Sequence, residues 1–227
     1  MNSLAVITGA SQGLGFALAR KLADNRWTLV VDARSAERLT RAVDELGAIT
    51  EVVAVAGDVS DAAHREELIE AAAALGPIDL VVNNASTLGA SPLPALDEID
   101  SGVLSTTFDV NVIAPLALSR LALPHLAPGA VIVNITSDAG VEAYPGWGGY
   151  GASKAALEHA SRVLAVEHPE LRVLVVDPGD MRTEMHQDAF PGEDISDRPT
   201  PDESAAGIVQ LVTSTAPSGR YLAREQR

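Results

Sequence analysis

Short apolar runs alternate along the chain with longer stretches in which apolar residues recur every three or four positions. The runs predict buried strands, and the stretches predict helices with one apolar face. The predicted strands lie at 4–7, 27–31, 51–56, 79–82, 130–136, 171–177 and 220–222. The predicted helices lie at 15–25, 35–46, 60–75, 101–126, 150–168 and 202–215, and Pro115 is expected to kink the fourth or to stand near a helix start.

Strands that are apolar throughout, separated by helices, are typical of a parallel sheet covered on both faces. No linker-like segment and no repeat interrupts the alternation. The sequence therefore predicts one α/β domain over residues 1–227, a doubly wound parallel sheet of about seven strands. Ligands of this architecture bind where the strands end.

Charge and residue composition exclude several classes of function. The chain has 227 residues, with 16 basic and 31 acidic side chains and a net charge of −15, which argues against sequence-independent nucleic-acid binding. The absence of cysteine excludes disulfides and thiolate chemistry, and the five histidines have no metal-like spacing. No apolar run of about 18 residues and no basic leader is present, so we expect no membrane span and a cytoplasmic protein.

A glycine-rich turn joins the first predicted strand to the first predicted helix. Gly9, Gly13 and Gly15 stand in the spacing Gly-x3-Gly-x-Gly. Gly9 permits a tight turn, Gly13 lets the backbone approach a phosphate, and Gly15 allows close helix packing. The helix N-terminus would then present amide groups to a pyrophosphate. The alternative is a glycine-rich loop without a ligand.

Tyr150 and Lys154 are four residues apart at the start of a predicted helix, so both lie on one helix face. A cation near a phenol lowers its pKa and makes it a better proton-exchange group at neutral pH. Lysine is scarce here, since 14 of the 16 basic residues are arginine, so a lysine at this place suggests a chemical task. The alternative is an exposed pair that shares a face by accident.

These motifs resemble those of the short-chain dehydrogenase/reductase family, in its classical branch. Ser137 stands 13 residues before Tyr150, as in the family pattern, and Asn111 occupies the position of the family's catalytic asparagine. Residues 83–86 read Asn-Asn-Ala-Ser where the family has Asn-Asn-Ala-Gly, and residues 178–183 match its motif after the sixth strand. The resemblance covers essentially the whole chain and implies a Rossmann-like, NAD(P)-binding fold.

The resemblance also implies roles for four catalytic residues. Tyr150 would be the general acid in carbonyl reduction, or the base in alcohol oxidation. Lys154 would lower the pKa of Tyr150 and bond the nicotinamide ribose, and Ser137 would hold the substrate oxygen. Asn111 would hold a water that links Lys154 to solvent. The nicotinamide supplies the hydride chemistry.

The implied cofactor contacts extend over the whole chain. They are Gly9, Ser11, Gln12, Gly13, Leu14, Gly15, Arg34, Asp58, Val59, Asn84, Ala85, Tyr150, Lys154, Pro178, Gly179, Met181 and Thr183. Asp58 and Val59 match the family's adenine contact, although Asp58 is also a plausible helix cap. No metal ligand is implied.

The end of the second strand bears on the choice between NADP(H) and NAD(H). The family's NAD-selecting acidic position falls on Ala33, and Arg34 follows it, as in NADP-preferring members. Asp32 falls one residue early and would point away, because side chains alternate along a strand. We therefore expect NADP(H), with NAD(H) as the alternative. Arg38 and Arg41 are expected on a solvated helix face.

Two stretches, 138–147 and 183–200, are expected to line the substrate site. The second reads as a loop with little structure, either a lid or a mobile surface loop. Trp147 and Phe190 suggest an apolar or aromatic substrate surface, and His186 lies in the region that caps the site in the family. The sequence does not name the carbonyl or alcohol substrate.

The hypothesis is thus an NADP(H)-dependent oxidoreductase that interconverts a carbonyl and an alcohol. A non-catalytic dinucleotide sensor or scaffold on the same fold is the alternative, and the four catalytic residues together argue against it. A sugar-nucleotide epimerase would carry another glycine spacing and a longer substrate region. The helices at 101–126 and 150–168 resemble those that pair subunits in the family, so we expect a homodimer or a higher homo-oligomer.

Overall fold

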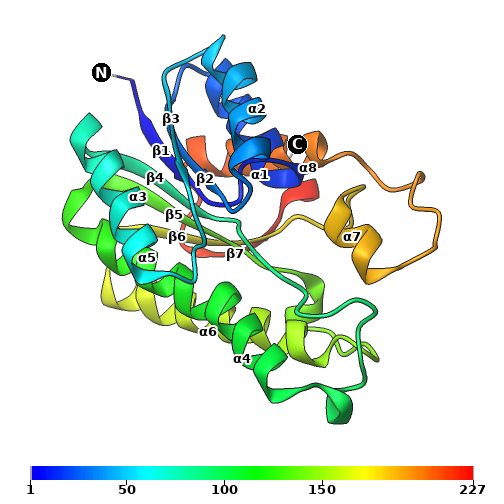
Figure 1. Cartoon of the computed structure of the whole chain (residues 1–227). Helices are drawn as coiled ribbons and strands as arrows, with labels where there is room; N and C mark the ends of the chain where they lie inside the picture. The colour runs from blue at the N-terminus through cyan, green and yellow to red at the C-terminus, as the bar shows by residue number, and fades with distance from the viewer. Residues whose placement is uncertain (1, 227) are drawn as a thin grey trace.

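The computed structural model describes residues 2–226, and within them seven strands form one parallel sheet in the order β3-β2-β1-β4-β5-β6-β7 (Figure 1). The strands are β1 (Leu4–Ile7), β2 (Thr28–Ala33), β3 (Val52–Ala56), β4 (Ile78–Asn83), β5 (Leu126–Ile135), β6 (Arg172–Asp177) and β7 (Gly219–Leu222). Every neighbouring pair is parallel. The predicted doubly wound α/β fold is confirmed.

Helices cover both faces of the sheet (Figure 1). They are α1 (Gly13–Asp24), α2 (Ala36–Gly47), α3 (Ala62–Leu75), α4 (Ser101–Phe108), α5 (Ala114–Ala122), α6 (Gly148–Glu167), α7 (Glu184–Ala189) and α8 (Pro201–Thr213). Ala5 and Ile7 of β1 face a core shared with α1, α2 and α8, whereas Leu4 and Val6 face one shared with α3 and α5. This alternation explains why the central strands are apolar, since they bury both faces, whereas the edge strands β3 and β7 are partly exposed.

The segment predicted as one helix over 101–126 is divided. A π-helical turn, Asp109–Ile113, separates α4 from α5, and Pro115 stands in the first turn of α5, where a missing amide costs no helical bond. The interruption therefore lies before the proline, and β5 begins at Leu126. By length and composition alone, Ser101–His125 is apolar enough to cross a membrane, since its most apolar 18 residues have a mean hydropathy of 1.3, but core helices of folded proteins pass the same test. The sequence analysis found no continuous apolar run of this length. Short polar residues interrupt the run here, but they lower its mean hydropathy little.

Two further boundaries differ from the prediction. Helix α3 begins at Ala62, because the Asp61 side chain caps it by accepting from the Ala63 amide. The segment 183–200, predicted as a loop, contains α7, whose N-cap is Thr183. Six residues are too few to show a helical period, so only the capping threonine could have indicated this helix.

The strand order places the site. From β1 the chain steps outward to β2 and β3, then crosses to β4 on the other side of β1 and continues to β7. The loops that follow β1 and β4 therefore diverge to opposite sides of the sheet. A crevice opens between them at the carboxyl ends of the strands, where doubly wound sheets bind ligands.

Candidate active site

The glycine-rich turn has the geometry that the spacing predicts. Gly9 and Gly13 have φ angles of +68° and +56°, in the left-handed region that favours glycine. A Cβ on Gly15 would lie 2.3 Å from the Gly9 carbonyl oxygen, so the helix can approach the turn only with glycine there. Gln12, the N-cap of α1, makes no side-chain capping bond, which leaves the first amides of α1 available. Such a helix N-terminus fits a pyrophosphate.

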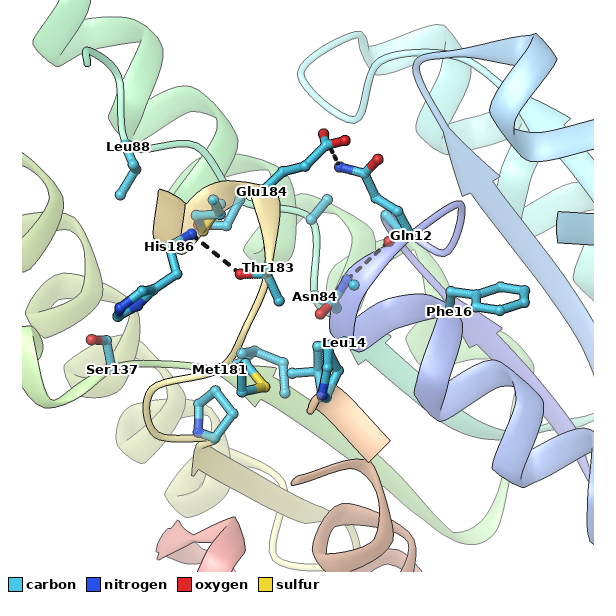
Figure 2. A pocket seen from close by; sticks show the side chains of 18 of the residues that line it. Gln12, Leu14, Phe16, Asn84, Leu88, Ser137, Met181, Thr183, Glu184 and His186 are labelled. Atoms are coloured by element: carbon cyan, nitrogen blue, oxygen red, sulfur yellow. Dashed lines mark hydrogen bonds between the residues drawn. The ribbon is translucent and has the colours of Figure 1, made fainter. Parts of the chain in front are cut away.

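A cavity of about 1270 Å³ runs along the carboxyl ends of the strands. This is larger than the usual small-molecule pocket of roughly 300–1,000 Å³ and has room for a dinucleotide with a substrate. Ser137 and His186 lie toward one end and Gln12 and Phe16 toward the other (Figure 2). The lining includes these predicted residues: Gly9, Ser11, Gln12, Gly13, Leu14, Arg34, Asp58, Val59, Asn84, Ala85, Ser137, Tyr150, Lys154, Pro178, Gly179, Met181 and Thr183.

Two predicted residues do not line the cavity. Gly15 packs behind the turn against Asn84, whose amide donates to the carbonyls of Thr8 and Gly9. Asn111 is buried in the π-helical turn, where the backbone widens locally. Its side chain accepts from the Ser86 hydroxyl and the Thr87 amide, and donates to the Thr87 carbonyl and Ser153. These four bonds use the full capacity of a carboxamide, so the expected water cannot be held by this side chain as it stands.

Tyr150 lies in the first turn of α6, and its phenol is buried in the cavity wall. Burial raises its pKa above the ordinary value, while hydrogen bonds with Ser86 and Ser137 act downward and the charges of Asp177 and Asp138 act upward. The net direction is opposite to the lowering that the spacing to Lys154 predicted. Ser86, where the family pattern has glycine, thus contacts the phenol, which the sequence did not indicate.

Lys154 is the next residue along the same helix face. Its Nζ donates to the Ile135 carbonyl at 2.9 Å and lies 5.4 Å from the centre of the Tyr150 ring. The ammonium thus lies near both the Tyr150 ring and the end of β5. Burial lowers the pKa of Lys154 to about 8, so its charge is titratable close to neutral pH.

Both carboxylate oxygens of Asp32 already have hydrogen-bond partners within the protein. Its carboxylate accepts from the Gly9 amide at 2.7 Å and lies 3.0 Å from His64 Nε2, and both side chains are buried. The hydrogen bond with Asp32 raises the pKa of His64 above its ordinary value. The sequence predicted only that His64 is no metal ligand, because a contact 32 residues away leaves no local signal. The pair fixes the glycine turn to α3.

The prediction for Arg38 was wrong. We expected it on a solvated face, but its guanidinium contacts the Gln12 amide oxygen and pairs with Glu184 of α7 at 2.8 Å. Gln12 also donates to Glu184, so these side chains bridge the glycine turn and the segment 183–200 (Figure 2). Arg41 follows the prediction, since its contact is an exposed pair with Glu37.

Aromatic rings form the other end of the cavity. Trp147 lies edge-on to Tyr150 with ring centres 5.6 Å apart, and it lies 5.8 Å from Phe190. His186 stacks obliquely on Phe190 at 4.9 Å and also lines the cavity. Both predicted substrate stretches therefore meet beside Tyr150.

Comparison with known proteins decides the family. A model of short chain dehydrogenases matches residues 3–194. The chain belongs to the short-chain dehydrogenase family. Members of this family are oxidoreductases, and the described geometry is consistent with their nicotinamide-dinucleotide fold.

Several reductases of the family are similar to this chain. Sulfoacetaldehyde reductase 2 from Chromohalobacter salexigens is 36% identical over 190 residues, which cover 81% of this chain and 75% of the relative. Sepiapterin reductase from Bos taurus is 34% identical over 200 residues, which cover 82% of this chain and 75% of the relative.

Solved structures of the family superpose closely. An alcohol dehydrogenase from Thermococcus sibiricus, complexed with 5-hydroxy-NADP, has a TM-score of 0.88 at 29% identity and covers 98% of this chain and 96% of that one. A short chain dehydrogenase from Burkholderia cenocepacia in complex with NADP has a TM-score of 0.88 at 27% identity, over 97% of this chain and 95% of that one.

Proposed function

We propose that this short-chain dehydrogenase reduces the carbonyl group of a small molecule with NADPH, and catalyses the reverse oxidation of the alcohol. The observation that carries the proposal is that Tyr150, with its hydrogen bonds to Ser86 and Ser137, shares one cavity with the uncapped N-terminus of α1. A dinucleotide with its pyrophosphate held at the α1 N-terminus would lie along this cavity toward Tyr150. A non-catalytic dinucleotide sensor would need the α1 N-terminus but not Tyr150.

The bound nicotinamide would supply a hydride to the carbonyl carbon. Ser137 would donate a hydrogen bond to the carbonyl oxygen and stabilise its developing charge. Tyr150 would transfer its proton to that oxygen. The raised pKa of Tyr150 keeps its phenol protonated at neutral pH, ready to act as an acid. The alkoxide that forms from the carbonyl is more basic than a phenolate, so proton transfer from Tyr150 to it is favourable. Lys154 would stabilise the phenolate that results.

The preference for NADP(H) rests on charge at the adenosine end of the cavity. Arg34 lines the cavity and is exposed, and Arg38 lies one helical turn further along the chain. Both carboxylate oxygens of Asp32 are engaged by Gly9 and His64, so this acid does not compete for ribose hydroxyls. Arg34 at the cavity wall, with Arg38 nearby in its ion pair with Glu184, favours a cofactor with an additional phosphate.

The substrate side favours a flat apolar or aromatic group next to the carbonyl. Trp147 and Phe190 present ring faces and edges beside Tyr150, and rings of this kind pack on other rings in offset or edge-on arrangements. Aryl ketones and aryl aldehydes are therefore the first compounds to test.

The experiment is a panel of aldehydes, ketones and secondary alcohols, followed by the absorbance of NADPH. We expect turnover by the wild type and a loss of roughly 10²–10⁴-fold in kcat for Tyr150→Phe, with NADPH binding retained. Tyr221→Phe is the matched control, because that hydroxyl donates to the Pro217 carbonyl away from the cavity. Tight NADPH binding without turnover on the whole panel would favour the sensor, and a fully active Tyr150→Phe would refute the proposed mechanism.

A further inference from the structure

A network of charges lies behind Ser137, in which the carboxylates of Glu158 and Asp177 are buried and Arg220 is partly exposed. Arg220 of β7 donates through Nε to Glu158 Oε1 at 3.1 Å and through Nη2 to Asp177 Oδ2 at 2.9 Å. The same Nη2 donates to the Ser137 carbonyl at 3.4 Å. The side chains of Glu158 and Asp177 are 1% and 5% exposed, so both carboxylates depend on protein partners. None of these contacts is part of the chemistry proposed above.

The network holds the strand end that carries Ser137. Glu158 follows Lys154 by one helical turn on the same face of α6, and it accepts from the Thr136 hydroxyl at 2.7 Å. Lys154 donates to the Ile135 carbonyl, and Arg220 donates to the Ser137 carbonyl. Three successive residues at the end of β5 are thus each fixed by a different charged side chain.

The network also holds the opposite wall of the cavity. Asp177 ends β6, and its second oxygen accepts from the Gly179 amide at 2.9 Å. The Pro178–Gly179 turn lines the cavity, and Ser204 of α8 donates to the Pro178 carbonyl. Through Asp177, one guanidinium therefore ties this turn to the Ser137 segment. The planar fork of arginine reaches several acceptors at once, which the single ammonium of lysine cannot do.

We propose that Arg220 is a positioning residue that sets Ser137 and the Pro178–Gly179 turn relative to Tyr150, and this inference rests on the proposed function. Its charge has a second effect. Asp177 from β6 and Asp138 from the turn after β5 face Tyr150, as does Lys154 from its own helix. The guanidinium offsets the Asp177 charge, so its removal would expose the phenol to a stronger negative field and make proton loss harder.

The test compares Arg220→Met and Arg220→Lys in the full chain, with Arg224→Met as the matched control on the exposed turn after β7. We expect Arg220→Met to lower kcat by roughly 10–100-fold, as do other losses of a supporting residue. The pH midpoint of alcohol oxidation should move to higher pH. Arg220→Lys should retain the wild-type midpoint but not the wild-type kcat, because it keeps the charge and loses the fork. NADPH affinity should fall about fivefold in Arg220→Met, the effect of losing one or two hydrogen bonds on the turn.

Each outcome decides a separate point. A folded Arg220→Met variant with wild-type kcat, pH midpoint and NADPH affinity would overturn the inference, as would equal losses in Arg224→Met. If Arg220→Met does not fold, Arg220→Lys decides, and wild-type kcat in that variant would refute positioning by the fork. If the wild type binds NADPH but turns nothing over, the proposed function fails, and equal NADPH affinity of wild type and Arg220→Met would then overturn the role of Arg220.

Discussion

At the scale of residues, the reactive groups owe their properties to burial more than to their sequence neighbours. The spacing of Tyr150 and Lys154 predicted a shared helix face, and the structure confirms it. Burial moves the two pKa values in opposite directions, upward for the phenol and downward for the ammonium. Spacing along a helix is local and can be read from a sequence, whereas desolvation depends on segments that are distant in the chain.

The lowered pKa of Lys154 predicts a pH dependence. Below pH 8 the ammonium is charged and can stabilise the phenolate of Tyr150, and above it this charge is lost. The kcat for carbonyl reduction should therefore decline as pH rises through about 8. In Lys154→Arg, whatever its absolute rate, the decline should vanish because a guanidinium does not titrate there. A decline that persists unchanged in this variant would assign it to another group.

Arg34 predicts the cofactor preference. Arg34→Ala should raise the KM for NADPH roughly tenfold or more, the effect of losing a charge-assisted bond to phosphate, and change that for NADH little. Arg41→Ala is the matched control, since Arg41 pairs only with exposed Glu37 among the partners that the structure describes. If Arg34→Ala leaves the kinetics with both cofactors unchanged, the assignment is wrong.

At the scale of elements, the strands were predictable and the irregular pieces were not. Apolar runs placed the central strands to within a few residues, because a strand buried on both faces is largely apolar, whereas the edge strand β7 is partly exposed and carries Arg220. The π-helical turn that holds Asn111 leaves no periodic signal, and α7 is too short to show one. Contacts between elements, such as Asp32 with His64, were beyond sequence reasoning because they depend on the packing of α3 against β2.

The Asp32–His64 pair predicts a pH-dependent stability. His64 has a raised pKa in the folded protein, so its contribution is complete below about pH 6.5 and is lost as pH rises through the folded value. His64→Gln should lower the free energy of unfolding by roughly 3 kcal/mol near pH 6 and flatten its decline toward pH 8. At more acid pH the loss should shrink, because burial raises the pKa of Asp32 and its protonation breaks the ion pair. Urea unfolding at several pH values measures this, with exposed His159→Gln as the control. A His64→Gln curve parallel to that of the wild type would contradict the prediction.

At the scale of the whole molecule, exposed apolar residues on the π-helical turn and on α6 predict assembly. Ile113 of the turn and Val163 and Val166 of α6 are 53%, 42% and 81% exposed, and these two elements contact each other. We propose that a second copy of the chain covers these residues. Light scattering at micromolar concentration should give at least twice the 23.6 kDa chain mass.

The double variant Ile113→Glu and Val166→Glu should reduce that mass to one chain, because it places charge on two of these exposed apolar residues. Leu75→Glu, at the end of α3, is the control for an added charge on another exposed apolar residue. A wild type of one chain mass would refute the assembly.

The position of Arg220 in β7 has a consequence for how the protein is made. Synthesis proceeds from the N-terminus, so the other six described strands leave the ribosome before this one. The glycine turn, Tyr150 and Lys154 can therefore all be present while the carboxylates of Glu158 and Asp177 still lack their guanidinium partner. Until β7 joins the edge of the sheet, these two buried acids lack Arg220, and Glu158 has only the exposed Arg162 as a cationic partner among the described residues.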